Sequence, residues 1–242
     1  MSYVDLKHLL ADLTLEALQH PSTVPWAAIA AAYAELARTD RPQVPWTAVR
    51  TRAAELGARL GWQPNEAALD LLLRAGLLQS DHATLTVRSS FVPHLAYMRR
   101  QTARLLDVLW RLREPRLPVS QPDAVVRGTA LFNSGLFFEC HEFLEGVWKS
   151  TAGAAKDFYH GIVQVAAAFY HLEKGNLHGA RTLLGKGLRH LEPYPPVYQD
   201  VNLGALRSAL EPWVAYCRSP KEYPAPEKYP TIKPVTSDQM RS

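Results

Sequence analysis

The stretches ALFNSGLFFECHEFLEGVW (residues 130–148) and DFYHGIVQVAAAFYHLEKGN (residues 157–176) decide the fold of the C-terminal half. In the first stretch, apolar residues recur at helical spacing and predict one long helix from about Asp123 to Trp148. In the second stretch, the same spacing predicts a helix from about Lys156 to Lys174. Residues 122–217 are therefore predicted to form an all-helical bundle.

Polar groups lie on the side of each predicted helix that is opposite its apolar stripe. On the first helix, His141 and Glu142 stand four and three residues before Glu145, so the three side chains can converge on one point. On the second helix, small residues flank the polar face, which indicates close approach by another helix. The polar residues on this second face are Asp157, His160, Gln164 and His171.

An antiparallel pairing of these helices would face two carboxylates with two imidazoles, which suits a divalent-metal or acid–base site. We predict His141, Glu142, Glu145 and His171 as metal ligands, and Glu142, Glu145 and Gln164 as catalytic groups. The ion would be Zn, Mn or Fe, and no other cofactor is predicted. The alternative is structural: an ordinary helix ion pair, and a hydrogen-bond network that fixes helix register. His-Glu-x-x-Glu is neither the zinc-protease motif nor the Glu-x-x-His pair of di-iron bundles.

Two motifs in this half resemble the family catalogued as domain of unknown function 309. They are FNSGLFFECHEFLEGVW (residues 132–148) and DFYHGIVQVAAAFYHLEKGNLHGARTLL (residues 157–184). The resemblance covers residues 124–195 and implies a compact all-helical domain with a shared Glu/His/Gln face. Metal-dependent hydrolysis is the activity guessed for members, many of which have Gln where His160 stands. The matching positions are Phe132, Asn133, Gly135, Glu139, His141, Glu142, Glu145, Trp148, Gly161, Gln164, His171, Gly175, Asn176, Gly179 and Ala180.

Residues 1–98 predict a separate helical domain of winged-helix-like type, so the fold class is mostly α. VPWAAIAAAYAEL (residues 24–36) and VPWTAVRTRAAEL (residues 44–56) start alike, with Pro in the first helical turn. A third helix should begin near Asn65 and end at Gly76. Turn residues and an alternating segment then predict a short β-hairpin, at Ser80, Asp81, His82 and at Leu85, Thr86, Val87.

The third helix of this domain would enter a DNA groove if the domain bound DNA. It carries Glu66 and Asp70 against Arg74, which is a poor match to phosphate. The net charge of +4 comes from residues 99–120 and from the tail after residue 217. Residues 1–98 and residues 121–217 each hold eight basic and nine acidic residues. Nucleic acid is therefore not a predicted partner.

Two further segments complete the organisation. Residues 99–121 predict a basic helix and a linker, and residues 218–242 predict a Pro-rich extended tail. Cys140 and Cys217 form no disulfide framework, and the N-terminus lacks the pattern of a secretion signal. No apolar run is long enough to cross a membrane. The expected location is the cytoplasm.

Two interpretations of the function follow. The first is a metal-dependent hydrolase with its His/Glu/Gln site on the C-terminal bundle, acting on a small molecule. The second is a non-enzymatic adaptor or regulator that acts through the winged-helix-like domain, by contact with a protein rather than with DNA. They make different demands: an enzyme needs the cluster open to solvent, whereas an adaptor needs an exposed surface for its partner.

Overall fold

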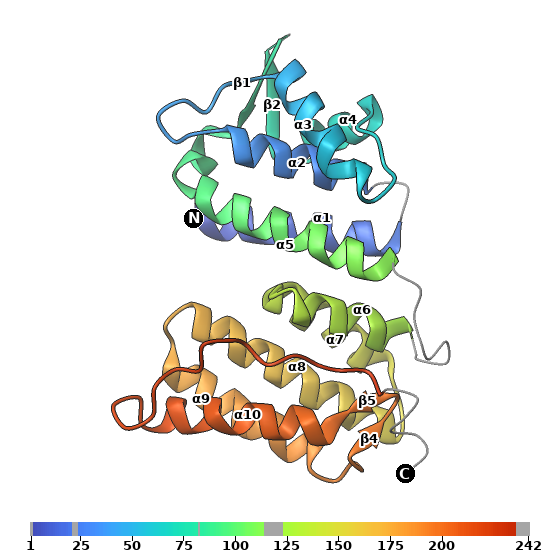
Figure 1. Cartoon of the computed structure of the whole chain (residues 1–242), viewed down its shortest axis with the longest axis vertical. Coiled ribbons are helices and arrows are strands. Elements are labelled where there is room, and N and C mark those ends of the chain that lie inside the picture. Colours follow the sequence, from blue (N-terminus) through green and yellow to red (C-terminus); the bar gives the residue numbers. More distant parts are fainter. Residues whose placement is uncertain (1, 21–23, 82, 114–122, 236–242) are drawn as a thin grey trace. The chain divides into compact units, whose positions relative to one another are not determined.

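Helices dominate the computed structural model, which describes residues 2–20, 24–81, 83–113 and 123–235. These residues form ten α-helices and a few short antiparallel strand pairs (Figure 1). The predicted mostly-α fold is confirmed. The chain divides into two units, Met1–Arg113 and Glu114–Ser242. Within the described ranges, no helix has both the length and the hydropathy that a membrane span requires.

The first unit contains five α-helices and a three-stranded sheet among its described residues. The predicted helices at residues 24–36, 44–56 and 65–76 are present as α2, α3 and α4. The sheet is antiparallel in the order β1-β3-β2, and Leu78 lies opposite Val87. The winged-helix-like assignment stays a prediction, and His82 of the predicted turn lies outside the described residues. The elements are α1 (Ser2–Gln19), α2 (Pro25–Leu36), β1 (Val44–Pro45), α3 (Trp46–Ala58), α4 (Glu66–Arg74), β2 (Leu78–Asp81), β3 (Thr84–Val87), the 3₁₀ segment η2 (Ser89–His94) and α5 (Leu95–Arg113).

Helix α2 forms the centre of the first unit because almost its whole length is apolar and buried. Trp26, Ile29 and Tyr33 are each 0% exposed. The Tyr33 hydroxyl donates a hydrogen bond to the Pro42 carbonyl at 2.8 Å and accepts one from the Val87 amide at 2.6 Å. This hydroxyl therefore joins α2 to β3 and to the loop before β1.

The basic helix packs inside the first unit. Its Arg99 side chain donates to the carbonyls of Ala34 and Ala37 at 2.8 and 3.0 Å, where α2 ends. Arg99 thus stabilises the C-terminus of α2, as a cation does near the negative end of a helix dipole. The boundary that we predicted between residues 98 and 99 falls within α5. The linker part of the predicted segment 99–121, which follows this helix, lies outside the described residues.

The second unit begins with two helices where the sequence predicted one, so the single long helix from Asp123 to Trp148 is wrong. Gly135 has a φ of +77° and ends α6. The Leu136 amide donates to the Leu131 carbonyl at 3.0 Å, which is the closing bond of a Schellman cap. The elements are α6 (Asp123–Asn133), α7 (Phe137–Ser150), α8 (Ala154–Glu173), α9 (Leu177–Leu191), β4 (Val197–Tyr198), β5 (Val201–Asn202) and α10 (Leu203–Arg218).

Helix α8 lies between α7 and α9 in this bundle, and glycines set how closely α9 approaches it. A Cβ at Gly161 would lie 2.7 Å from Leu191, and one at Gly187 would lie 3.0 Å from the Gly161 carbonyl. The two helix backbones therefore touch at a pair of glycines. Gly175, with a φ of +70°, ends α8, and the Asn176 side chain caps α9 by accepting from the Gly179 amide at 2.8 Å.

Candidate functional site

Helices α7 and α8 pack antiparallel, the arrangement that the predicted site assumes. The Trp148 ring stacks on the His160 ring at one end of the pair, with centroids 4.2 Å apart and planes 13° apart. At the other end, Phe138 contacts Tyr170 with centroids 5.2 Å apart. The two contacts fix the register of the helices: Trp148 lies beside His160, and Phe138 lies beside Tyr170, the residue before His171. Eleven residues separate His160 from His171 within α8, which is about 16 Å along a helix.

The predicted ligands have separate partners in the structure. His141 Nδ1 lies 3.1 Å from Glu142 Oε1, so these two neighbours meet. Glu145 pairs instead with Lys149 at 3.1 Å, one turn further along α7. His171 Nδ1 lies 2.9 Å from the amide nitrogen of Asn176, at the C-terminal end of α8. The structure brings His141 and Glu142 together, but it places Glu145 and His171 with other partners.

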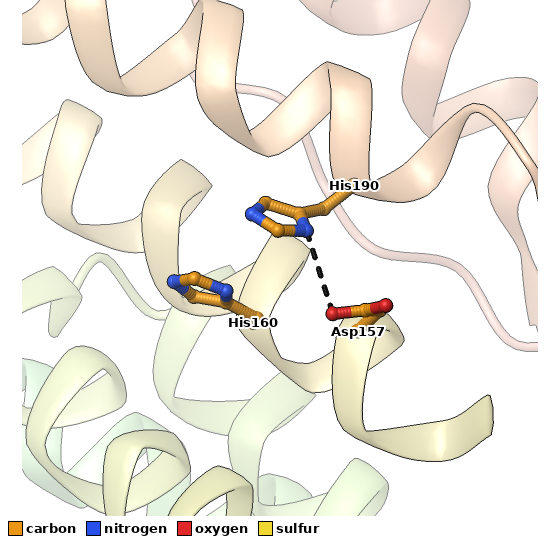
Figure 2. A group of neighbouring side chains, drawn as sticks. All are labelled: Asp157, His160 and His190. Carbon is orange, nitrogen blue, oxygen red and sulfur yellow. Dashed lines mark ion pairs between the residues drawn. The ribbon is translucent and has the colours of Figure 1, made fainter. Parts of the chain in front are cut away.

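A different group of side chains gathers at the opposite end of α8. One nitrogen or oxygen atom from each of Asp157, His160 and His190 lies within 4.8 Å of the others (Figure 2). Among the described residues, this is the one group of three or more His, Cys, Asp or Glu side chains that meets so closely. His190 Nδ1 lies 3.7 Å from Asp157 Oδ1, and the two imidazole centroids are 4.1 Å apart.

Local sequence explains how these side chains meet. Asp157 and His160 are three residues apart in the first half of α8, so they project from the same face. His190 comes from the last turn of α9, which reaches this face because Gly161 and Gly187 allow the backbones to touch. Figure 2 shows the two rings turned toward each other, with the carboxylate beside them. Asp157 is exposed and both histidines are half-buried, so the group opens to solvent.

The surroundings of His160 hold its ring and keep it neutral. Trp148 covers one ring face, and the Gln164 amide nitrogen lies 2.9 Å from His160 Nε2. Burial lowers the pKa of His160 below its ordinary value, and the neighbouring His190 lowers it further, whereas Asp157 acts in the opposite direction. A neutral imidazole is the form that binds a metal ion.

Of the three predicted catalytic residues, Gln164 is the one that contacts this group, at His160. Its amide oxygen is buried, and no hydrogen-bond partner for it lies among the described residues. An unsatisfied buried acceptor is costly, so it points to a partner outside the protein or to the opposite amide orientation. A half-turn of the amide leaves its shape unchanged and would set the oxygen against His160 Nε2.

Sequence reasoning placed Asp157 and His160 on the right face but did not choose them as ligands. The signal that could have found them is the Asp-x-x-His spacing at residues 157–160, which puts both groups one turn apart. No local pattern marks His190. Its place in the group depends on the packing of α9 against α8.

The comparisons with known proteins concern the same bundle. Residues 125–183 match the model of the family described as "Domain of unknown function (DUF309)". The matched residues lie in the C-terminal half, where the two motifs predict the resemblance. The match does not extend to the N-terminal unit.

Two relatives share this part of the chain. One is "Uncharacterized protein YpuF" of Bacillus subtilis (strain 168), 35% identical over 68 residues, which are 28% of this chain and 39% of that protein. Another is an "Uncharacterized protein" of Aquifex aeolicus (strain VF5), 30% identical over 81 residues, which are 33% of this chain and 24% of that protein. The chain spans less than half the length of either relative.

Proposed function

We propose that the C-terminal bundle is a metal-dependent hydrolase domain that holds a divalent ion on Asp157, His160 and His190. The observation that carries the proposal is the convergence of three ligand atoms within 4.8 Å on a face that opens to solvent. Two imidazoles and one carboxylate are the protein ligands of catalytic zinc and of non-haem iron sites. Three protein ligands leave a coordination position for water, and a bound ion makes that water a stronger acid.

Neighbouring side chains would complete such a site. Trp148 fixes the plane of the His160 ring, which limits the direction from which an ion can be bound. Gln164 would accept a hydrogen bond from His160 Nε2 after the half-turn of its amide, as the second partner of a metal-bound histidine usually does. Glu142 and Glu145 are half-exposed on the neighbouring helix and stay our candidates for proton transfer.

Metal binding is tested on the full chain, purified without an affinity tag and without chelators. Elemental analysis is expected to find about one Zn, Mn or Fe per chain, and titration of the stripped protein should recover it. Asp157→Asn and His190→Ala should each weaken binding by about 100-fold or more, because losing even an outer-shell partner costs 10–100-fold. His178→Ala is the matched control, since His178 is an exposed histidine on the same helix.

Two results would contradict this assignment. Unchanged metal content in an Asp157→Asn, His190→Ala double variant would show that the ion is held elsewhere. Loss of metal in a Glu145→Ala, His171→Ala double variant, with the His190 variant unaffected, would return the site to the set that we predicted from sequence. A screen with phosphate-ester, amide and lactone substrates then tests hydrolysis, with the His190→Ala protein as the inactive control.

A second candidate function concerns the first unit, and its topology favours it. The order α2-β1-α3-α4-β2-β3, with sheet order β1-β3-β2, supports the winged-helix-like interpretation. The exposed side of α4 carries Glu66 and Asp70, and Arg74 pairs with Asp70 at 2.9 Å. We therefore propose contact with a protein partner. Random-sequence duplex DNA should show no salt-dependent binding to the full chain between about 50 and 200 mM salt.

A further inference from the structure

The chain leaves α10 at Arg218 and returns along the bundle as an extended segment. Within residues 219–228, all but Ser219 and Pro226 are exposed, and the backbone hydrogen bonds of this segment are local ones at Ser219. Residues 229–235, the docked tail, instead contact elements throughout the second unit. The dark red trace after α10 in Figure 1 follows this path. The docked tail is therefore joined to the bundle by a connection that is itself barely anchored.

The bundle binds the backbone of the docked tail. The Asn133 side chain donates to the Ile232 carbonyl at 2.8 Å and accepts from the Ile232 amide at 2.8 Å. The Asn202 amide donates to the Lys233 carbonyl at 3.0 Å, and the Val235 amide donates to the Asp200 carbonyl at 2.9 Å. Four hydrogen bonds thus recognise main-chain groups, which every extended peptide possesses.

The hydrogen bonds from Asn202 to Lys233 and from Val235 to Asp200 extend the β4–β5 hairpin by one more extended segment. Val201 of β5 forms an antiparallel bridge with Pro234 of the docked tail. Addition of an extended segment to the free edge of a strand is a common mode of peptide recognition. In that mode main-chain bonds give affinity, and pockets for particular side chains give specificity.

Only some side chains of the docked tail enter the bundle. Ile232 and Val235 are 2% and 1% exposed, whereas Lys233 and Pro234 between them are exposed. Ile232 closes a small apolar cavity of about 10 Å³ whose other walls come from α6, α7, α8 and β5. The Tyr229 ring stacks on a ring of α10, that of Trp213, with centroids 5.3 Å and planes 22° apart.

The turn that presents this strand edge has an unusual backbone. Gln199 and Asp200 have φ values of +48° and +58°, a region that residues other than Gly enter at a steric cost. A two-residue hairpin with both φ values positive normally uses Asn-Gly. Such strain in a folded protein clusters at binding sites. Here it aims the Asp200 carbonyl at the docked tail.

We infer that Asn133, Asp200, Val201, Asn202 and Trp213 form a peptide-docking surface, which residues 229–235 occupy in cis. Its partner is an extended segment of another protein with the same pattern: an aromatic residue, Pro, then Ile three and Val six positions after the aromatic. The docked tail itself shows what the surface accepts, because the bundle binds its main chain at Ile232, Lys233 and Val235 and holds the side chains of Tyr229, Ile232 and Val235. Release of the tail through its exposed connection would free the surface for that partner.

The test uses the full chain with a site-specific protease sequence in place of residues 221–226, all of which lie in the exposed connection. The probe is a fluorescent peptide of residues 227–235. Cut protein should exchange its tail for the probe and raise the probe's anisotropy. Uncut protein should not, because its own tail acts at an effective concentration of about 1 mM.

Variants separate recognition from non-specific adhesion. Asn133→Ala in the cut protein should weaken probe binding by about tenfold or more, because two hydrogen bonds are lost. A probe with Ile232→Asp should not bind, whereas one with Lys233→Ala at an exposed position should bind as the parent does.

Three results would overturn the inference. If cutting unfolds the bundle, measured by far-ultraviolet circular dichroism, the tail is an indispensable part of the core. If the cut protein stays folded but binds no probe, the surface accepts no peptide in trans. If uncut protein forms a dimer at micromolar concentration that Ile232→Asp abolishes, the trans occupant is a second copy of this chain.

Discussion

Replacement of Gly187 by Ala tests the helix contact on which the metal proposal depends. In the interior of an exposed helix, Gly→Ala stabilises by about 1 kcal/mol, because Ala has the higher helix propensity. At Gly187 the new Cβ would lie 2.8 Å from Val165 Cγ2 and 3.0 Å from the Gly161 carbonyl oxygen. The second contact is with backbone, so α8 and α9 must move apart. Overpacking of this kind costs about 1–3 kcal/mol and outweighs the gain.

Gly185→Ala on the same helix is the matched control. Its Cβ would meet only Arg189 Nη1 at 3.6 Å, an ordinary contact, so this variant should be stabilised by about 0.5–1 kcal/mol. The two variants should thus differ by about 1–3 kcal/mol. Calorimetry of the full chain should show this as a difference of several degrees in the melting of the second unit, at roughly 4 °C per kcal/mol.

The outcome bears on the site as well as on stability. The ring centroids of His160 and His190 lie 4.1 Å apart only because these backbones touch. Gly187→Ala should therefore also weaken metal binding in protein that is still folded. Equal stabilisation by Gly187→Ala and Gly185→Ala would refute the tight helix contact and remove the reason for placing His190 beside His160.

Three further predictions concern single side chains. Tyr33→Phe should cost about 1–3 kcal/mol, because the buried Val87 amide and Pro42 carbonyl lose their partner. Burial raises the pKa of Tyr33 above 10.0. The stabilisation that the Tyr33 hydroxyl provides is therefore intact below about pH 10 and is lost as pH rises through the raised pKa. The midpoint of urea unfolding, measured from pH 8 to 11, should fall for the parent protein and fall less for the variant. Asn65→Ala should cost about 1 kcal/mol of stability, because the Asn65 side chain caps α4 by accepting a hydrogen bond from a backbone amide at 2.8 Å. Asn65→Asp should keep most of that stability, and the same urea titration measures both variants. Burial raises the pKa of Cys140, and the charge of Glu139 raises it further. A thiol reagent at pH 8 should therefore modify Cys140 only at the rate at which the bundle opens. Fast modification of Cys140 under native conditions would contradict its burial.

Local signals predicted the correct helices in most places. Pro in the first turn, Asn before the fourth helix and Gly175 after the eighth each mark a boundary that the structure places there. One exception is Gly135, which ends a helix that apolar periodicity alone would continue. Periodicity reports which side of a helix is buried, and it is insensitive to a break that keeps the buried side in phase.

The candidate site shows a second feature that helical spacing does not predict. Helices α7 and α8 form the antiparallel pair that the predicted site assumes. However, helical spacing gives the angle of a side chain around its own axis and says nothing of its height relative to a neighbouring helix. Trp148 against His160 fixes that height, and the structure pairs His171 with Asn176 and Glu145 with Lys149.

The sequence by itself determined the mostly helical fold, the family segment in the C-terminal half and the side of each helix that carries polar groups. Only the tertiary structure decided which of those groups meet. Asp157 and His160 lie one turn apart on a single helix, so their proximity is local. His190 joins them because Gly161 and Gly187 let two backbones touch, and the tail docks because Asn133 finds Ile232 ninety-nine residues away. Contacts between distant segments depend on packing, which no local pattern encodes.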